Sequence, residues 1–164
     1  MTTVAIGLEL SAEADVASIA VAARDGGKWL ADLVFYGSPD EAAGQCSKLY
    51  GDLDTCGVFA DPLPCAGIVD DLRVNVWAHL LGPEDVAAAS WQFTTEVRGR
   101  RVKLGSHPAL KKSMQAAVPR PLAVRFAFER RRVTADMSPL NAAAFALWGL
   151  RKNEALSEPG VWAI

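Results

Sequence analysis

The chain has few of the residues that build zinc sites and disulfide frameworks. Its 164 residues include three cysteines, none of them in C-x-x-C spacing, and two histidines. Because the histidines lie far from each other and from the cysteines in the sequence, a zinc site is disfavoured. The odd number and irregular spacing of Cys46, Cys56 and Cys65 are typical of reduced, mostly structural thiols in an intracellular protein.

Long apolar runs are also missing. No run approaches the roughly 20 residues that a membrane-spanning helix needs, and no basic segment leads into an apolar one at the N-terminus. The sequence therefore predicts neither a membrane span nor a secretory signal. Hydrophobic residues make up 51% of the chain, which suits one domain with a substantial core. We expect a single domain over residues 1–164, with its core in about 3–150 and a polar tail in 151–164.

Basic side chains are scarce in the first part of the chain. Residues 1–71 contain three basic and 12 acidic side chains, a net charge of −9, whereas residues 72–164 contain 14 basic and seven acidic ones, a net charge of +7. A basic half beside an acidic half suits a polyanion that is bound through the second half and presented to acids in the first. Chance segregation of ordinary surface charge is the alternative.

Hydrophobic periodicity and turn residues predict an α/β domain. Three β-rich segments come first and are joined by turns, one of them at Gly26-Gly27, so they should form an antiparallel meander. Ser38 and Pro39 then begin a helix, because serine caps a helix N-terminus and proline fits its first turn. We expect strands at 3–10, 16–23, 29–36, 56–60, 74–78 and 122–129, helices at 39–50, 83–97, 108–118 and 139–150, and a loop or short helical turn at 63–71. This order resembles that of the ribonuclease-H-like fold, a mixed β-sheet flanked by α-helices.

Three acidic residues stand next to apolar segments and are candidate metal ligands. Glu9 and Asp61 each end a short apolar run, and Asp136 lies just before the apolar stretch 140–150. An acid in such a place risks burial without a counter-charge, which is costly. Three acids that meet at one edge of a sheet would repel one another unless a cation joined them. We therefore predict a divalent-metal site made by Glu9, Asp61 and Asp136.

Each of the three acids also has an ordinary structural explanation. Glu9 could be an exposed residue at a strand end, and Asp61, which precedes a proline, could be an acidic turn residue. Asp136 could cap the last helix, but Ser138 is in place for that role, so we expect Asp136 to face another partner. Asp15 is a weaker fourth candidate that lies near a turn.

The predicted ligand set consists of carboxylates without a histidine, which favours Mg²⁺ or Mn²⁺ over Zn²⁺. Two such ions about 4 Å apart can activate a water molecule and stabilise the leaving oxygen of an in-line phosphodiester displacement. The same three acids are therefore the candidate catalytic residues.

Basic residues are clustered in the second half of the chain. Clusters on turns and strand ends suit contacts to the phosphate backbone of a nucleic acid, although solubilising surface charge explains any single cluster equally well. His107 precedes a proline and is expected to begin a helix rather than to take part in catalysis. The candidate nucleic-acid-binding residues are Arg98, Arg100, Arg101, Lys103, Arg130, Arg131 and Arg132.

The segments around the three acids resemble the C-terminal nuclease domain of bacteriophage terminase large subunits, a member of the ribonuclease-H-like superfamily. The resemblance spans most of residues 3–150 and rests on 6–11 with Asp15, 58–62, 82–86, 107–110 and 136–143. It implies a metal-dependent endonuclease that cuts concatemeric viral DNA during genome packaging, with Glu9, Asp61 and Asp136 as ligands of two Mg²⁺ or Mn²⁺ ions. The chain departs from the family pattern at Glu9, where the family usually has aspartate.

The resemblance also implies partners and a location. The partners are double-stranded DNA and the terminase ATPase domain, small subunit and portal, and the location is the cytoplasm of a bacterial host cell. The chain has no ATPase motif of its own, because Trp29 follows Gly26-Gly27-Lys28 where a phosphate-binding loop has serine or threonine. Two other interpretations stay open: a nucleic-acid-binding or packaging-assembly module with a degenerate metal site, and a fragment of an actin-like or sugar-kinase ATPase.

Overall fold

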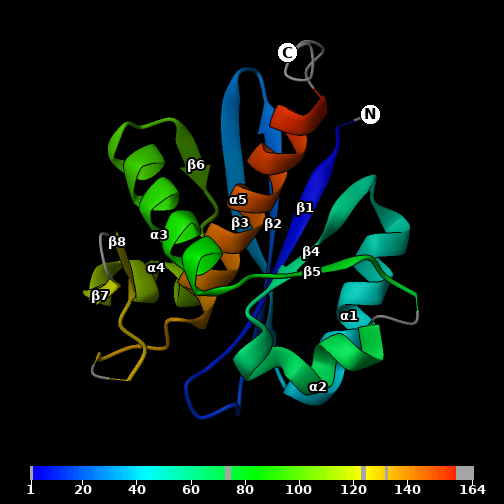
Figure 1. Ribbon diagram of the computed structural model, residues 1–164, viewed down its shortest axis with the longest axis horizontal. Coiled ribbons are helices and arrows are strands. Elements are labelled where there is room, and N and C mark those ends of the chain that lie inside the picture. The colour runs from blue at the N-terminus through cyan, green and yellow to red at the C-terminus, as the bar shows by residue number, and fades with distance from the viewer. Residues whose placement is uncertain (1, 73–74, 123–124, 132, 158–164) are drawn as a thin grey trace.

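The computed structural model describes residues 2–72, 75–122, 125–131 and 133–157, and a six-stranded mixed sheet lies at its centre (Figure 1). Its strands are β1 (Val4–Leu10), β2 (Ala17–Asp25), β3 (Lys28–Gly37), β4 (Thr55–Ala60), β5 (Ala78–Leu80) and β6 (Val102–Leu104). They lie in the order β5-β4-β1-β2-β3-β6. β1, β2 and β3 form the antiparallel meander that the sequence predicts, whereas β4 is parallel to β1, β5 to β4 and β6 to β3.

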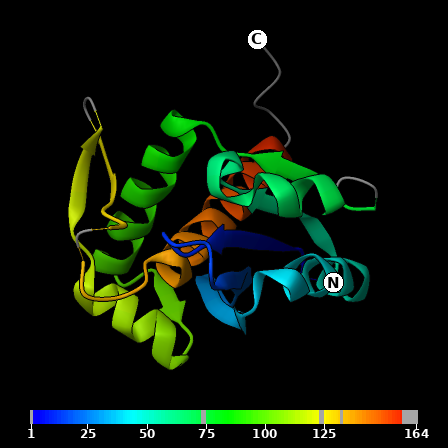
Figure 2. The same cartoon turned by 90° about the horizontal axis from the view of Figure 1, so that it is seen from below.

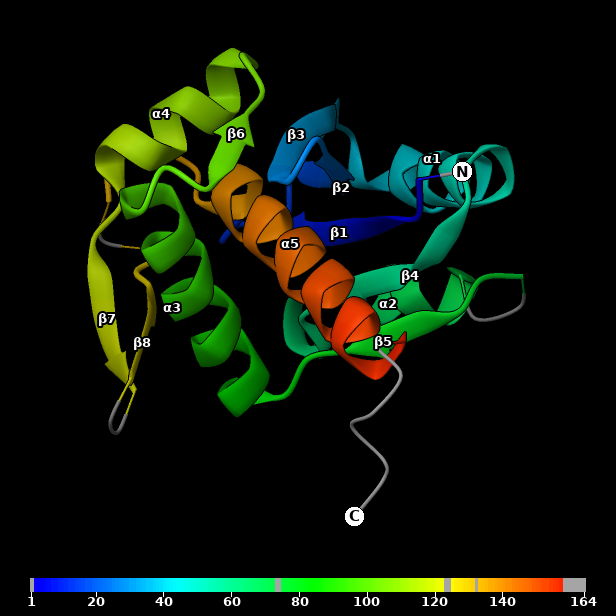
Figure 3. The same ribbon diagram turned by 90° about the horizontal axis from the view of Figure 1, so that it is seen from above.

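Helices cover both faces of this sheet, and a small β-hairpin lies outside them. The helices are α1 (Pro39–Asp52), α2 (Pro62–Leu72), α3 (Pro83–Arg98), α4 (Pro108–Ala116) and α5 (Ser138–Ser157), and the hairpin strands are β7 (Pro119–Leu122) and β8 (Arg125–Phe128). α1 and α2 lie on one face of the sheet, and α5 crosses the other face with α3 and α4 on its outer side (Figure 3). The hairpin packs against α3.

Strand β1 is buried on both faces because helices cover both of them. Ile6 and Leu8 belong to the core beneath α1 and α2, while Ala5 belongs to the core beneath α5. Gly7 lies on the Ala5 face, and a Cβ atom there would overlap the carbonyl group of Ala142 in α5. The glycine therefore allows the helix to lie directly against the strand, two residues from Glu9.

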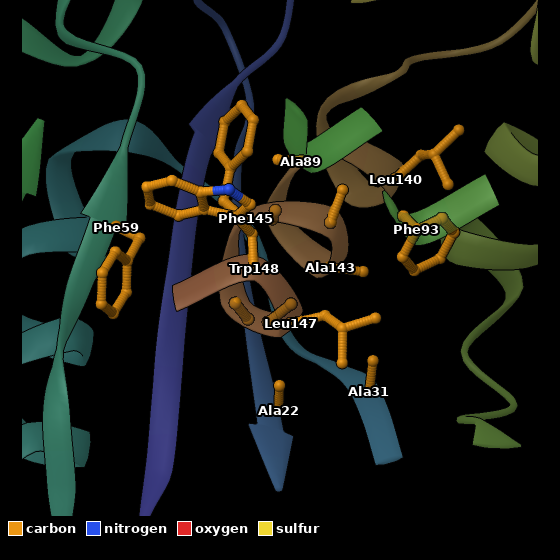
Figure 4. Packing of buried hydrophobic residues seen from close by; sticks show 14 of the residues in the cluster. Ala22, Ala31, Phe59, Ala89, Phe93, Leu140, Ala143, Phe145, Leu147 and Trp148 are labelled. Carbon is orange, nitrogen blue, oxygen red and sulfur yellow. The ribbon is translucent and has the colours of Figure 1, made fainter. Parts of the chain in front are cut away.

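Helix α5 is buried around its circumference from Leu140 to Leu150, because it lies between the sheet and α3. Small alanine side chains in this stretch keep the helix close to the strands. The larger Phe145, Leu147 and Trp148 fill the remaining space between the sheet and the outer helices (Figure 4). This packing explains why the last helix has an almost uninterrupted apolar stretch rather than an amphipathic pattern.

Two segments differ from the sequence-based expectation near the middle of the chain. Residues 63–71, expected as a loop or a short turn, belong to the 11-residue helix α2. Pro62 and Pro64 do not break this helix, because they lie in its first turn, where backbone N–H groups lack a partner within the helix. The strand expected at 74–78 is instead the short β5, which begins at Ala78.

The other differences lie toward the C-terminus. The strand expected at 122–129 is confirmed over Arg125–Phe128, which forms β8, but Leu122 belongs to a second strand, β7, that pairs antiparallel with β8. β7 carries two prolines, and among the described residues it pairs with β8 alone. Helix α5 is confirmed but continues to Ser157, so the first part of the expected tail 151–164 is helical. The remaining tail residues lie outside the described part of the chain. Within the described part, no helix has the length and apolarity needed to cross a membrane.

Candidate metal site at one edge of the sheet

Glu9 is the second-last residue of β1 and is buried, with 1% of its surface exposed. Its Oε1 accepts a hydrogen bond from the Leu10 N–H at 2.9 Å and lies 3.6 Å from the Cys65 Sγ of α2. Its Oε2 has no hydrogen-bond partner among the described residues. The interpretation of Glu9 as an exposed strand-end acid is therefore wrong, and the described part of the chain offers one of its oxygens no hydrogen-bond donor.

Burial is the main cause that raises the pKa of Glu9 to about 8. The Arg130 guanidinium opposes this shift, and the negative charge of Asp61 adds to it. Burial, followed by the charge of Glu9, also raises the pKa of Cys65, which therefore stays a neutral thiol and can donate to the carboxylate. The Glu9 carboxyl group keeps its proton at neutral pH unless a stronger cation comes close.

Asp61 immediately follows β4 and lies at the same edge of the sheet as Glu9. The two strands run parallel with Ala60 beside Leu8, so residues at their C-terminal ends meet. Asp61 Oδ1 accepts a hydrogen bond from the Leu63 N–H at 3.1 Å at the start of α2, which is the turn role that the sequence leaves open. Asp61 Oδ2 faces Arg130 at 3.9 Å, and 17% of the side chain is exposed.

Arg130 lies between these two carboxylates, although the sequence places it in a nucleic-acid-binding cluster. Its Nη2 is 3.5 Å from Glu9 Oε1 and donates a hydrogen bond to the Leu10 carbonyl at 2.9 Å. Its Nη1 reaches toward Asp61. The chain therefore supplies its own cation to the acids, from a segment about 120 residues away from Glu9.

Asp136 caps helix α5, so the expectation that Ser138 leaves it without this role is wrong. Asp136 Oδ1 accepts a hydrogen bond from the Ser138 N–H at 2.9 Å, and Oδ2 accepts from the Ser138 hydroxyl at 2.8 Å and the Tyr36 hydroxyl at 3.2 Å. The Ser138 Oγ also lies 2.7 Å from Ser18 Oγ, and Ser18 is the cross-strand partner of Glu9. Figure 2 shows the start of α5 beside the end of β1. Asp136 is thus tied to the edge of the sheet that carries Glu9.

The structure brings Glu9 and Asp61 together and holds Asp136 in a separate hydrogen-bond network. Among the described residues, no group of three or more histidine, cysteine, aspartate and glutamate side chains is arranged to hold a metal ion. The Glu9–Asp61 pair still suits a hard divalent cation, because its donors are oxygens and Glu9 Oε2 is buried without a partner. Asp136 already accepts three hydrogen bonds, two from Ser138 and one from Tyr36, and a bound ion would share its carboxylate with them.

Two weaker candidates have structural roles. Asp15 accepts a hydrogen bond from the Ser11 hydroxyl at 2.6 Å in the turn between β1 and β2. His107 caps α4, since its Nδ1 accepts from the Ala109 N–H at 3.1 Å, as the sequence predicts. Sequence reasoning missed Ser18 and Tyr36, although the two hairpin turns set the registers that place Ser18 beside Glu9 and Tyr36 beside Ser18.

The first basic cluster lies at the other end of the sheet from these acids. It extends from the end of α3 to strand β6, which pairs with β3 near Leu30. The acids lie near the other end of β3, where Tyr36 neighbours Ser18, the partner of Glu9. Six residues along a strand separate the two ends by about 20 Å. The members of this cluster are Arg98, Arg100, Arg101 and Lys103.

The members of the basic clusters differ in their surroundings. Arg101 donates to the buried Glu96 of α3 at 2.6 Å. Arg151 of α5 also contacts Glu96, so Glu96 helps to join α3 to α5. Arg131 is exposed and directly follows Arg130 in the sequence. Arg132 lies outside the described residues. The role of these residues in DNA binding stays a prediction.

Solved structures with the same fold come from viral terminases, although no protein-family model and no curated protein matches the sequence. The large terminase of bacteriophage HK97 superposes on 92% of this chain with a TM-score of 0.74 at 16% identity. The large terminase nuclease of thermophilic phage G20c superposes on 88% with a TM-score of 0.67 at 13% identity. The human cytomegalovirus terminase nuclease domain, from a manganese-soaked crystal, superposes on 89% with a TM-score of 0.53 at 12% identity.

These comparisons establish the fold of the chain as that of terminase nuclease domains. The predicted ribonuclease-H-like α/β architecture, a mixed sheet flanked by helices, is confirmed. The chain spans 40% of the HK97 large terminase but 81% of the G20c nuclease. The similarity therefore concerns the nuclease part of the longer protein.

Proposed function

We propose that this chain is a divalent-metal-dependent DNA endonuclease that cuts concatemeric phage DNA during genome packaging. The observation that carries the proposal is the meeting of Glu9 and Asp61 at one edge of a terminase-nuclease fold, with Glu9 Oε2 buried and without a hydrogen-bond partner in the described part of the chain. Two carboxylates in this position suit a cation, and their burial is otherwise costly.

Glu9, Asp61 and Asp136 are the proposed ligands of two Mg²⁺ or Mn²⁺ ions. When bound, the ions supply an activated water molecule and stabilise the leaving oxygen of a phosphodiester. Glu9 has to lose its proton to serve, and nearby positive charge favours this loss. Cys65 and the Leu10 N–H hold Glu9 Oε1, and this leaves Oε2 as the oxygen that can bind a cation. As the third ligand, Asp136 would share its carboxylate between the ion and its hydrogen bonds to Tyr36 and Ser138.

The wider assignment follows from the same fold. Double-stranded DNA is the proposed substrate, bound through the basic half of the chain. The proposed protein partners are the terminase ATPase domain, small subunit and portal, in the cytoplasm of a bacterial host cell. Residues 1–164 act as the single nuclease domain in this assignment.

The test is cleavage of supercoiled plasmid DNA with Mn²⁺ and with a chelator. We expect nicking and linearisation with Mn²⁺ alone, and a loss on the order of 100-fold in Asp61→Asn and Glu9→Gln, because a lost ligand costs at least as much as a lost supporting residue. Asp25→Asn is the matched control, since Asp25 lies at the far end of β2. Cleavage that persists in chelator or in both site variants would refute the proposal.

A second candidate function is a nucleic-acid-binding or packaging-assembly module with a degenerate metal site. The observation that favours it is Arg130, which already gives both carboxylates a counter-charge. Salt-sensitive DNA binding that is indifferent to Mn²⁺, together with an absence of cleavage, would select this function.

A further inference from the structure

The Arg130 side chain contacts groups of the protein that a residue binding only DNA phosphates would not need to contact. Its Nη2 donates to the Leu10 carbonyl at 2.9 Å, which fixes the guanidinium at the end of β1. The distances of 3.5 Å to Glu9 and 3.9 Å to Asp61 exceed those of a close two-pronged ion pair. The side chain is 23% exposed. The guanidinium thus lies between two acidic side chains without making a close ion pair with either of them.

We propose that Arg130 is a tethered counter-ion that competes with a divalent cation for Glu9 and Asp61 and leaves them when the cation binds. This inference rests on the proposed function, because it concerns the same two carboxylates. A single positive charge at 3.5–3.9 Å compensates two acids poorly, whereas a divalent ion binds carboxylate oxygens directly with twice the charge. Only molecules in which Arg130 has left the two acids can then bind the ion. The apparent association constant for metal is therefore the intrinsic constant multiplied by the fraction of such molecules.

The backbone around Arg130 is also held by contacts that do not involve the Arg130 side chain. Glu129 Oε1 accepts hydrogen bonds from the N–H groups of Arg130 and Arg131 at 3.0 and 3.1 Å, and these bonds hold the turn after β8. The segment can therefore keep its conformation while the guanidinium moves. Arg131 has the same charge and an exposed side chain, and no ion pair joins it to a carboxylate among the described residues. It provides a matched control for the loss of one positive charge.

The test is titration of the full chain with Mn²⁺, without DNA, by isothermal calorimetry and by thermal melting. Arg130→Gln should bind Mn²⁺ about tenfold more tightly than the wild type, the change expected when Arg130 is engaged in about 90% of molecules. Arg131→Gln should change the affinity less than twofold. Without metal, Arg130→Gln should melt at a lower temperature than the wild type, and Mn²⁺ should raise its melting temperature by more.

The outcomes separate this inference from the proposed function. Equal tightening in Arg130→Gln and Arg131→Gln would overturn the inference, because Arg130 would then act only through its long-range charge, and the metal site would stand. Binding in neither the wild type nor Arg130→Gln would overturn the proposed metal site and this inference with it. If Arg130→Gln does not fold, Arg130→Lys keeps the charge without the two-pronged reach. It should bind Mn²⁺ more tightly than the wild type, and wild-type affinity would overturn the inference.

Discussion

Glu9 shows how one buried side chain makes the stability of a whole domain depend on pH. Its pKa rises from an ordinary 4.5 to about 8, mainly through burial and further through the charge of Asp61, against the opposing effect of Arg130. Between these two pH values the folded protein holds a proton that the unfolded chain has lost, so the free energy of unfolding falls as the pH rises. Below about pH 4.5 the group is protonated in both states and the loss vanishes. A bound cation would remove the loss as well, because it stabilises the carboxylate.

The residue-scale prediction is that Glu9→Gln removes this pH dependence in metal-free protein. From pH 5 to pH 8.5 the free energy of unfolding should fall by a few kcal/mol in the wild type and stay nearly constant in the variant, because glutamine has a similar shape and no proton to lose. Urea unfolding in chelator at both pH values measures the difference. Glu13→Gln, at an exposed position in the following turn, should behave as the wild type does. A wild-type-to-variant gap that is the same at both pH values would contradict the raised pKa of Glu9.

At the scale of elements, the contact between β1 and α5 positions the site, because it joins the strand that carries Glu9 to the helix that Asp136 caps. We predict that Gly7→Ala lowers the free energy of unfolding by about 1–3 kcal/mol, since the added methyl group would overlap the Ala142 carbonyl. Gly44→Ala in α1 is the matched control. Nothing lies near its added methyl group, so it should raise stability by up to about 1 kcal/mol. If urea unfolding gave the same change in the free energy of unfolding for both substitutions, the close approach of α5 to β1 at Gly7 would be contradicted.

Elements with strong local signals were predictable from the sequence, whereas contacts between distant segments were not. The meander β1 to β3 and helix α1 follow from alternation, glycine turns and the Ser38 cap, which are all local. Helix α2 could not be predicted with its full length, because Pro62 and Pro64 are typical of loops as well as of first helical turns. The position of Arg130 beside Glu9 depends on tertiary packing, and no spacing along the chain encodes it.

The candidate site shows the same limit. The placement of Glu9 and Asp61 at one edge follows from parallel strands and could be predicted. The cap that Asp136 forms on α5 could not be separated from a cap by Ser138, because both residues are suitable acceptors near the helix start. The Ser138 hydroxyl donates to Asp136 and also bonds to Ser18 of β2, a partner that only the folded chain supplies.

At the scale of the whole molecule, the acidic and the basic halves of the chain meet at the candidate site. Residues 1–71, with a net charge of −9, provide Glu9 and Asp61, and residues 72–164, with a net charge of +7, provide Arg130. Most of the acidic half lies on the α1 side of the molecule, while α3, α4 and the β7–β8 hairpin lie beyond α5 (Figures 1 and 3). A polyanion would therefore be attracted by one side and repelled by the other, and this asymmetry would favour one orientation of the proposed DNA substrate.

This asymmetry predicts a salt dependence that maps the DNA-binding side. Each phosphate contact releases counter-ions, so the logarithm of the binding constant should fall linearly with the logarithm of the salt concentration, by about 0.9 for each contact. Arg131→Gln and Arg100→Gln should each reduce this slope by about 0.9, because both side chains are exposed in the basic half. Lys48 is an exposed lysine of α1 paired with Asp52, and Lys48→Gln should leave the slope unchanged.

The slopes of the wild type and the three variants can be measured by fluorescence anisotropy with a labelled duplex at several salt concentrations. An equal slope in the two arginine variants and the wild type would place the DNA elsewhere. A reduction in Arg131→Gln alone would confine the DNA to the acidic edge of the sheet, since about 20 Å separates that edge from β6.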